Sequence, residues 1–165
     1  MPMISGRFDA NAVEWRRIAE PDSDDIKINF EFSLLGYDIP SGRLDMLLRF
    51  AGDGGHCRRH RHVASTATLI LEGEQHVEEV QPDGSTKTIV RRAGDYALAG
   101  ADALPHLERG GPDGCTLLLS LHAHDGVLFE YFDRDMNSRA LLSIEQYVKS
   151  WESGAIPADA AVTPA

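Results

Sequence analysis

The chain has 165 residues, of which 42% are hydrophobic and 25% charged, the composition of a soluble globular protein with one domain. Its net charge of −10 argues against a nucleic-acid partner and against docking on an anionic membrane, because both need a basic surface. The sequence shows no signal peptide, no apolar run of about 20 residues and only two cysteines, so we expect a cytoplasmic protein without disulfides or membrane spans.

Apolar and polar residues alternate in two stretches of the first half of the chain, which is the pattern of a half-buried β-strand. The two stretches cover 26–32 and 44–50, and a turn that contains Pro40 and Gly42 separates them. A shorter strand is predicted at 13–15, and the acidic segment 21–25 is predicted to be a loop.

Further short strands follow, separated by segments rich in glycine, proline and aspartate. The predicted strands are 60–62, 67–72, 75–80, 86–91, 96–98, 116–122 and 127–132. The predicted turns and loops are Glu72-Gly73, 81–85, 100–106, 110–114 and Asp125-Gly126. Many short strands joined by such turns predict an all-β sandwich or barrel.

One helix is predicted near the C-terminus, at 143–152. Ser143 and Gln146 have the spacing of a capping box, and an apolar face repeats at helical spacing up to Trp151. We therefore expect a single domain over 1–153, with its barrel core at 26–132 and a flexible tail at 154–165.

Three histidines are the candidate metal ligands. His60 and His62 are two residues apart on a predicted strand, so both side chains point to the same face. Imidazole suits several first-row metals, and two such side chains can share one ion. His106, in a later loop, is the third candidate. The alternative is that these are ordinary strand histidines that bind no metal.

The residues around the histidine pair resemble the first motif of the cupin superfamily, whose members are small double-sheet jelly rolls. That motif begins with a glycine, and five residues separate this glycine from a His-x-His triplet. A glutamate follows the triplet after three or four further residues. A second glycine, separated from the glutamate by six residues, ends the motif. Gly54, His60, His62 and Gly73 fit this spacing, whereas Thr66 stands at the glutamate position. Gly94-Asp95 resembles the start of the second motif, whose closing histidine would be His106.

This resemblance implies a jelly-roll barrel, also called a double-stranded β-helix, with one metal ion inside it and a short C-terminal helix. Carried over residue by residue, the ligands would be His60, His62 and His106, and the ion a divalent first-row metal. The resemblance favours Fe2+, with Zn2+, Ni2+, Mn2+ or Cu2+ as alternatives. Further candidates for the pocket or for support of the ligands are Thr66, Thr68, Tyr96 and His122.

A three-histidine set is similar to that of the cupins that cleave acetylacetone and related diketones or dihydroxyacetophenones with O2. The resemblance therefore implies a metal-dependent dioxygenase, acting on a small diketone or hydroxyketone, and a homodimer joined through its N-terminal strands. One alternative is a cupin that binds a metal or small ligand without turnover, as a sensor does; the other is a metal-dependent isomerase or lyase.

Several neighbouring residues have two interpretations. Arg58, Arg59 and Arg61 either attract an anionic substrate or are solvated surface charges, and the second is favoured. Strand alternation predicts that Cys57 lies on the face opposite His60. His122 and His124 form a second His-x-His beside a predicted turn, where exposure without a metal is the simpler interpretation.

Overall fold

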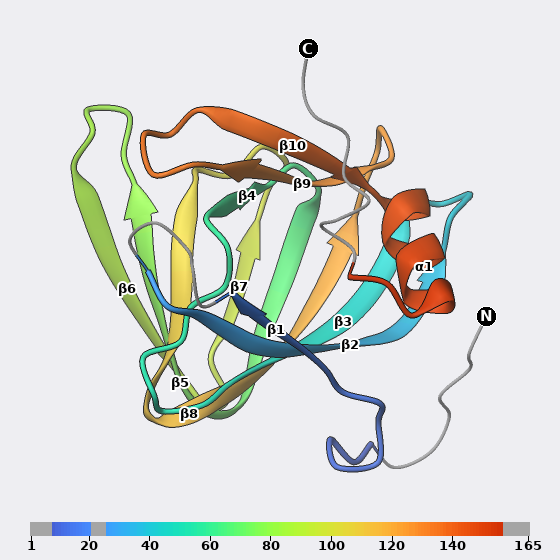
Figure 1. Cartoon of the computed structure of the whole chain (residues 1–165), viewed down its shortest axis with the longest axis horizontal. Helices are drawn as coiled ribbons and strands as arrows, with labels where there is room; N and C mark the ends of the chain where they lie inside the picture. The colour runs from blue at the N-terminus through green and yellow to red at the C-terminus, as the bar shows by residue number, and fades with distance from the viewer. Residues whose placement is uncertain (1–7, 21–25, 157–165) are drawn as a thin grey trace.

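The computed structural model describes residues 8–20 and 26–156. Within these ranges it contains a set of antiparallel strands and one helix (Figure 1). The elements are β1 (Arg16–Glu20), β2 (Ile28–Asp38), β3 (Arg43–Phe50), β4 (His60–His62), β5 (Ser65–Val80), β6 (Thr86–Arg92), β7 (Tyr96–Ala99), β8 (His106–His122), β9 (Val127–Phe132), β10 (Ser138–Ser143) and α1 (Ile144–Ser153). The predicted loop at 21–25 and most of the predicted tail, 157–165, lie outside the described residues.

The strands curl into a barrel, which confirms the predicted all-β jelly roll. One run of paired strands has the order β1-β2-β3-β8-β4-β9-β10, and β5 pairs with β6, β7 and β8. Strand β8 belongs to both runs, and its 17 residues pair with β3 over one half and with β4 at its start. Figure 1 shows β5 and β6 on the side of the barrel opposite α1.

Two predicted breaks are wrong, because the strands continue through glycine. The structure shows one strand, β5, where two were predicted on either side of Glu72-Gly73, with shifts in register on both sides of that pair. Gly73 has a φ of +71°, and a Cβ there would lie 2.2 Å from the carbonyl oxygen of Gly114. The glycine therefore marks a β-bulge at a close approach of two backbones. In the same way β8 runs through the predicted loop at 110–114.

Two further differences concern the ends of the chain. The first strand is β1, Arg16–Glu20, and not the predicted 13–15. Strand β10 was not predicted, because its sequence SRALLS lacks alternation; its partner β9 places it in the sheet. Such strands are determined by pairing and not by local pattern.

The helix prediction is confirmed. Ser143 caps α1, its hydroxyl accepts a hydrogen bond from the Gln146 backbone, and the Gln146 side chain accepts one from the Ser143 backbone. Tyr147 and Val148 are buried in the barrel core, and Trp151 contacts Phe32 edge to face at 5.6 Å. The helix therefore closes one end of the barrel. In the described part of the chain no helix has the length and apolarity needed to cross a membrane.

Candidate metal centre and its two chambers

Strand pairing brings the three predicted histidines together inside the barrel. β4 pairs with β8 so that His60 lies directly opposite His106, and His62 follows on the same face of β4. The ring centroids are 4.5 Å apart for His60 and His106, and 5.1 Å apart for His60 and His62. Each histidine is at most 9% exposed. One ligand atom from each lies within 4.8 Å of the others, so the group can hold a metal ion.

Hydrogen bonds on the outer side of each ring determine which nitrogen carries the proton. His60 Nδ1 lies 2.6 Å from the carbonyl oxygen of Arg58, and His106 Nδ1 lies 3.3 Å from that of Leu104. A carbonyl oxygen only accepts, so both Nδ1 atoms carry hydrogen and both Nε2 atoms present a lone pair. This is the tautomer that a metal ligand needs.

Thr66, at the position of the motif glutamate, fixes the tautomer of His62 in the same way. Its hydroxyl donates to the carbonyl oxygen of Ala64 at 3.1 Å, so it accepts from His62 Nδ1 at 3.0 Å. His62 Nε2 is then also a lone-pair nitrogen. It lies 3.1 Å from His60 Nε2. Two lone pairs that face each other at this distance repel unless a cation lies between them.

The spacing of these two nitrogens fits a shared ion. Metal–nitrogen bonds of about 2.0–2.1 Å place two neighbouring ligand nitrogens about 2.9–3.4 Å apart. The observed 3.1 Å is within that range. Burial and the neighbouring His106 lower the pKa of His60 to about 3, and the same causes lower that of His62 well below its usual value. Both imidazoles are therefore neutral at physiological pH, as metal binding requires.

A carboxyl group that sequence analysis missed lies beside the histidines. Glu108 is 2% exposed, and its Oε1 lies 3.9 Å from His60 Nε2. Its Oε2 accepts a hydrogen bond from Gln75 Nε2 at 2.6 Å, and Arg91 in turn donates to Gln75 Oε1 at 3.0 Å. The signal was present in the sequence, because Glu108 follows His106 by two residues and so shares its face of the strand.

The structure also corrects the prediction for Cys57. Its Sγ lies 3.7 Å from His60 Nδ1, and Cys57, His60 and Glu108 form a second group of potential ligand atoms. Alternation fails here because β4 begins only at His60, so residues 57–59 do not follow the pleat of a strand. Burial raises the pKa of the Cys57 thiol well above its usual value, and the neutral thiol is a poor ligand.

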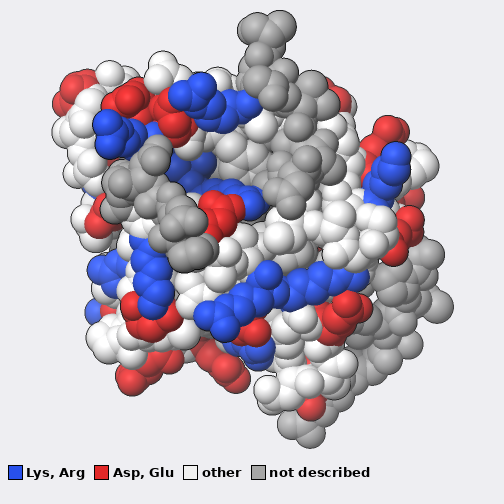
Figure 2. Space-filling model, viewed as in Figure 1, with Lys and Arg blue, Asp and Glu red and all other residues white. Residues whose placement is uncertain are grey.

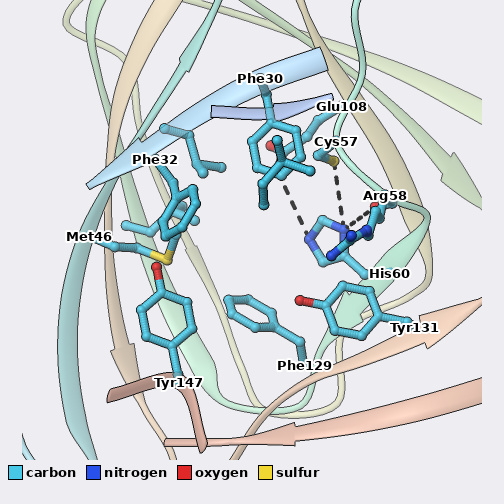
Figure 3. A pocket seen from close by; sticks show the side chains of 13 residues that line it. Phe30, Phe32, Met46, Cys57, Arg58, His60, Glu108, Phe129, Tyr131 and Tyr147 are labelled. Atoms are coloured by element: carbon cyan, nitrogen blue, oxygen red, sulfur yellow. Dashed lines mark hydrogen bonds and ion pairs between the residues drawn. The ribbon is translucent and has the colours of Figure 1, made fainter. Parts of the chain in front are cut away.

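An apolar cavity of about 50 Å3, the inner chamber, lies on the α1 side of His60 (Figure 3). Its walls come from β1, β2, β3, β9 and α1, and Glu108 and Cys57 border it beside His60. Figure 3 shows Phe129 and Tyr131 on one wall, and Phe30 and Phe32 facing them. The remaining lining residues are Ile18, Met46, Leu48, Arg58, Leu119 and Tyr147.

A second cavity of about 90 Å3, the outer chamber, borders His62 and His106 and is lined by β5, β6 and β7. Its walls include the polar side chains of Thr66, Thr68, Gln75, Glu79 and Arg91. Glu108 and Leu119 line both chambers. The three histidines therefore lie between an apolar space and a space whose walls carry more polar side chains.

The other predicted site residues lie in different places. Thr68 is buried and lines the outer chamber. Tyr96 is 64% exposed and is not among the lining residues of either chamber. His122 is at the far end of β8, with its ring 4.3 Å from that of His124. β8 is so long that His106 and His122 lie at opposite ends of it.

Two of the arginines in the predicted basic cluster, Arg58 and Arg61, form ion pairs. Arg58 pairs with Glu20, and Arg61 pairs with both Glu130 and Asp102. Figure 2 shows basic and acidic side chains next to one another across one face of the molecule. Attraction of an anionic substrate by free arginines is therefore not supported for Arg58 and Arg61.

Solved structures with a similar fold support this description of the barrel. A protein provisionally assigned as an acetylacetone dioxygenase from Methylibium petroleiphilum has a TM-score of 0.64 at 18% identity, over 92% of this chain and 97% of that one. An acetylacetone dioxygenase from Acinetobacter johnsonii has a TM-score of 0.62 at 15% identity, over 93% of each chain. A cupin 2 conserved barrel domain protein from Rhodopseudomonas palustris has a TM-score of 0.58 at 16% identity, over 96% and 95%. No protein-family model and no curated protein sequence matches the chain.

Proposed function

We propose that this chain, which has the cupin fold, is a metal-dependent dioxygenase that cleaves a C–C bond in a small diketone or hydroxyketone. The observation that carries the proposal is the pair of lone-pair nitrogens, His60 Nε2 and His62 Nε2, held 3.1 Å apart in a buried site. Two lone pairs that face each other repel, and a cation bound between them would remove that repulsion. The likeness to acetylacetone dioxygenases gives the reaction class its support.

His60, His62 and His106 would hold the ion, for which we favour Fe2+. A divalent ion bound by three neutral imidazoles would keep its full charge and would supply Lewis acidity toward a substrate oxygen. The chain's own part is positional. The carbonyl oxygens of Arg58 and Leu104 and the hydroxyl of Thr66 orient the three rings, and such partners commonly change metal affinity by 10- to 100-fold.

The surroundings of the site suit a substrate that is part apolar and part polar. The inner chamber excludes water from one side of His60, because its walls are aromatic and aliphatic. Glu108 presents a carboxyl oxygen at the same place, 3.9 Å from His60 Nε2. This oxygen can accept a hydrogen bond from an enol or hydroxyl of the substrate and so orient it.

The test is metal content by elemental mass spectrometry, on tag-free protein purified without chelator. We expect about one first-row metal per chain, and its loss in His60→Ala and in His106→Ala. The matched control is His122→Ala, which removes a histidine from the same strand as His106 and should keep the metal. Absence of metal after reconstitution with Fe2+, Zn2+ and Ni2+ would contradict the proposal.

The reaction is tested on the Fe2+-loaded protein by O2 uptake with acetylacetone and with a hydroxyacetophenone. We expect steady uptake that His62→Ala abolishes. A protein that binds one metal per chain yet consumes no O2 with any such compound would instead be a binding module or a metal-dependent isomerase or lyase.

A further inference from the structure

Two buried polar atoms without a hydrogen-bond partner belong to residues that line the same apolar chamber. Among the residues that the structure describes, three buried side-chain atoms have no such partner, and two of them are Glu108 Oε1 and Tyr147 Oη. Both residues line the inner chamber, and they are 2% and 3% exposed. Because an unpaired buried polar group destabilises a fold, these two groups mark the inner chamber as a place where a bound molecule would complete their hydrogen bonds.

The two atoms have opposite requirements. Tyr147 extends from α1 toward Met46 and has a hydroxyl hydrogen to donate, so it needs an acceptor (Figure 3). Glu108 Oε2 already accepts from Gln75, so Oε1 remains as an acceptor and needs a donor. In Figure 3, Tyr147 and His60 lie on opposite sides of the open centre, with Glu108 on the His60 side. A ligand that meets both atoms has a donor at one end and an acceptor at the other.

The charges around the inner chamber favour a neutral ligand. The one basic side chain among the chamber's lining residues other than His60 is Arg58, and its guanidinium is paired with Glu20. No second cation among these residues would offset the charge of a carboxylate ligand. Such a ligand would also face Glu108 across an apolar cavity, which is unfavourable.

The volume of the inner chamber limits the ligand to a short molecule. A cavity needs about 10–15 Å3 to hold one water-sized group, so about 50 Å3 holds roughly three to five heavy atoms. Anything longer must extend past Glu108 and Leu119 into the outer chamber, which both residues also line. The aromatic walls on both sides would pack against the carbon chain of the ligand.

We infer that the inner chamber binds a short, neutral molecule whose hydroxyl or enol end donates to Glu108 Oε1 and whose carbonyl end accepts from the hydroxyl of Tyr147. As a statement about substrate class, this rests on the proposed function; as a statement about binding, it requires only the chamber. The inferred contacts would make the chamber bind hydroxyketones and enolised diketones, which carry both groups, more tightly than simple ketones and keto acids.

The test measures dissociation constants by ligand-observed NMR, on metal-free protein and on Zn2+-loaded protein, in which no O2 chemistry occurs. The probes are hydroxyacetone, which is within the size limit of the chamber, and 4-hydroxy-2-butanone, which is longer by one methylene and would reach toward the outer chamber. Their matched controls are butanone and 2-pentanone, in which a methyl group replaces the hydroxyl, and acetoacetate as the anion. We expect at least one hydroxyketone to bind about tenfold more tightly than its matched ketone, and acetoacetate to bind more weakly than both in the metal-free protein.

Two variants assign the binding to the two atoms. Tyr147→Phe should weaken hydroxyketone binding about 3- to 10-fold while raising the melting temperature of the empty protein, because it removes an unpaired buried hydroxyl. Glu108→Gln should weaken it about 10- to 100-fold without weakening the matched ketone, since the amide can still accept from Gln75 but then turns a donor toward the chamber. Tyr37→Phe and Glu78→Gln, which alter residues outside the chamber, should leave hydroxyketone binding unchanged.

Equal affinity for hydroxyketones and matched ketones would overturn the inference and leave the two atoms to ordered water. So would a Tyr147→Phe variant that binds as well as the original chain, a test that does not depend on whether Glu108→Gln folds. If Glu108→Gln lowered metal content but not hydroxyketone binding to metal-free protein, Glu108 would be a metal ligand and the inference would fail. Selective binding by a chain that takes up no metal would refute the proposed function and leave this inference standing.

Discussion

The two chambers lie on either side of the same three histidines but differ in the side chains that line them. The inner chamber is enclosed by strands of the first half of the chain, by β9 and by α1, and its walls are mostly apolar. The outer chamber is lined by β5, β6 and β7, and its walls carry threonine, glutamine, glutamate and arginine side chains. Residues of β6 and β7 are largely exposed, whereas the residues around the inner chamber are mostly buried.

This difference suggests a division of roles within one barrel. The inner chamber can select the carbon skeleton of a ligand by shape, since close-packed apolar walls tolerate small changes of volume poorly. The outer chamber holds the chain of hydrogen bonds from Arg91 through Gln75 to Glu108, which orients the carboxyl group beside the three histidines. Four predictions test this division, from the largest expected effect to the smallest.

The wall between the chambers can be removed at Leu119. This side chain is 2% exposed and lines both cavities. Leu119→Ala should join the two chambers and lower the free energy of unfolding by about 2–5 kcal/mol, measured by urea denaturation. Leu98→Ala is the control, because Leu98 lines the outer chamber but is 69% exposed, so its loss should cost less than about 0.5 kcal/mol. Similar losses in the two variants would contradict the assignment of Leu119 to the wall.

The orientation of the His62 ring can be disturbed without creating a cavity in the core. Thr66→Val keeps the volume of the side chain but removes the hydroxyl that accepts from His62 Nδ1. We expect metal affinity to fall about 10- to 100-fold, measured by competition with a chelator. Thr68→Val, at a buried position two residues further along the same strand, is the matched control and should retain the original affinity. An unchanged affinity in Thr66→Val would show that the hydroxyl does not hold the ring.

Acid should weaken the metal-free protein through the buried histidines. The folded-state pKa of His60, about 3, is below its unfolded value of about 6.5, so between these values the unfolded chain binds a proton that the folded chain does not. The free energy of unfolding should therefore decrease as pH falls from about 6.5, by at most about 1.4 kcal/mol per pH unit for each such histidine. His60→Gln should show a shallower decrease in denaturation measured at pH 7, 6 and 5. A slope equal to that of the original chain would contradict this origin.

The smallest expected effect concerns the polar wall alone. Arg91→Met keeps most of the aliphatic stem but leaves Gln75 Oε1 without the hydrogen bond that it accepts from Arg91. We expect the free energy of unfolding to fall by about 0.5–1.5 kcal/mol. Hydroxyketone binding in the inner chamber should weaken less than in Glu108→Gln, because Gln75 can still donate to Glu108. Arg92→Met, at the next position, removes an exposed side chain that pairs with the half-buried Glu74, and it should lower the free energy of unfolding less than Arg91→Met does in the same urea titration. A loss of inner-chamber binding as large as that in Glu108→Gln would show that Gln75 does not orient Glu108 without Arg91.

The sequence by itself determined the features that depend on local periodicity. Alternation identified β2 and β3, the capping box located α1, and the two-residue spacing of His60 and His62 placed both rings on one face. The third histidine followed from the motif resemblance. These predictions needed only the geometry of a single strand or a single helix, which neighbouring residues dictate.

Only the tertiary structure decided how the site is completed. Glu108 and Cys57 reach His60 because β8 pairs with β4 and because the segment before β4 is not a strand. Tyr147, on a helix more than eighty residues along the chain from His60, borders the same chamber because α1 closes the end of the barrel. The continuity of β5 through Gly73 likewise depends on the backbone of Gly114 lying against it. The Cys57 contact is local and depends on the irregular backbone before β4. The other contacts join segments distant in sequence, and no local pattern encodes which distant surfaces meet when a sheet closes on itself.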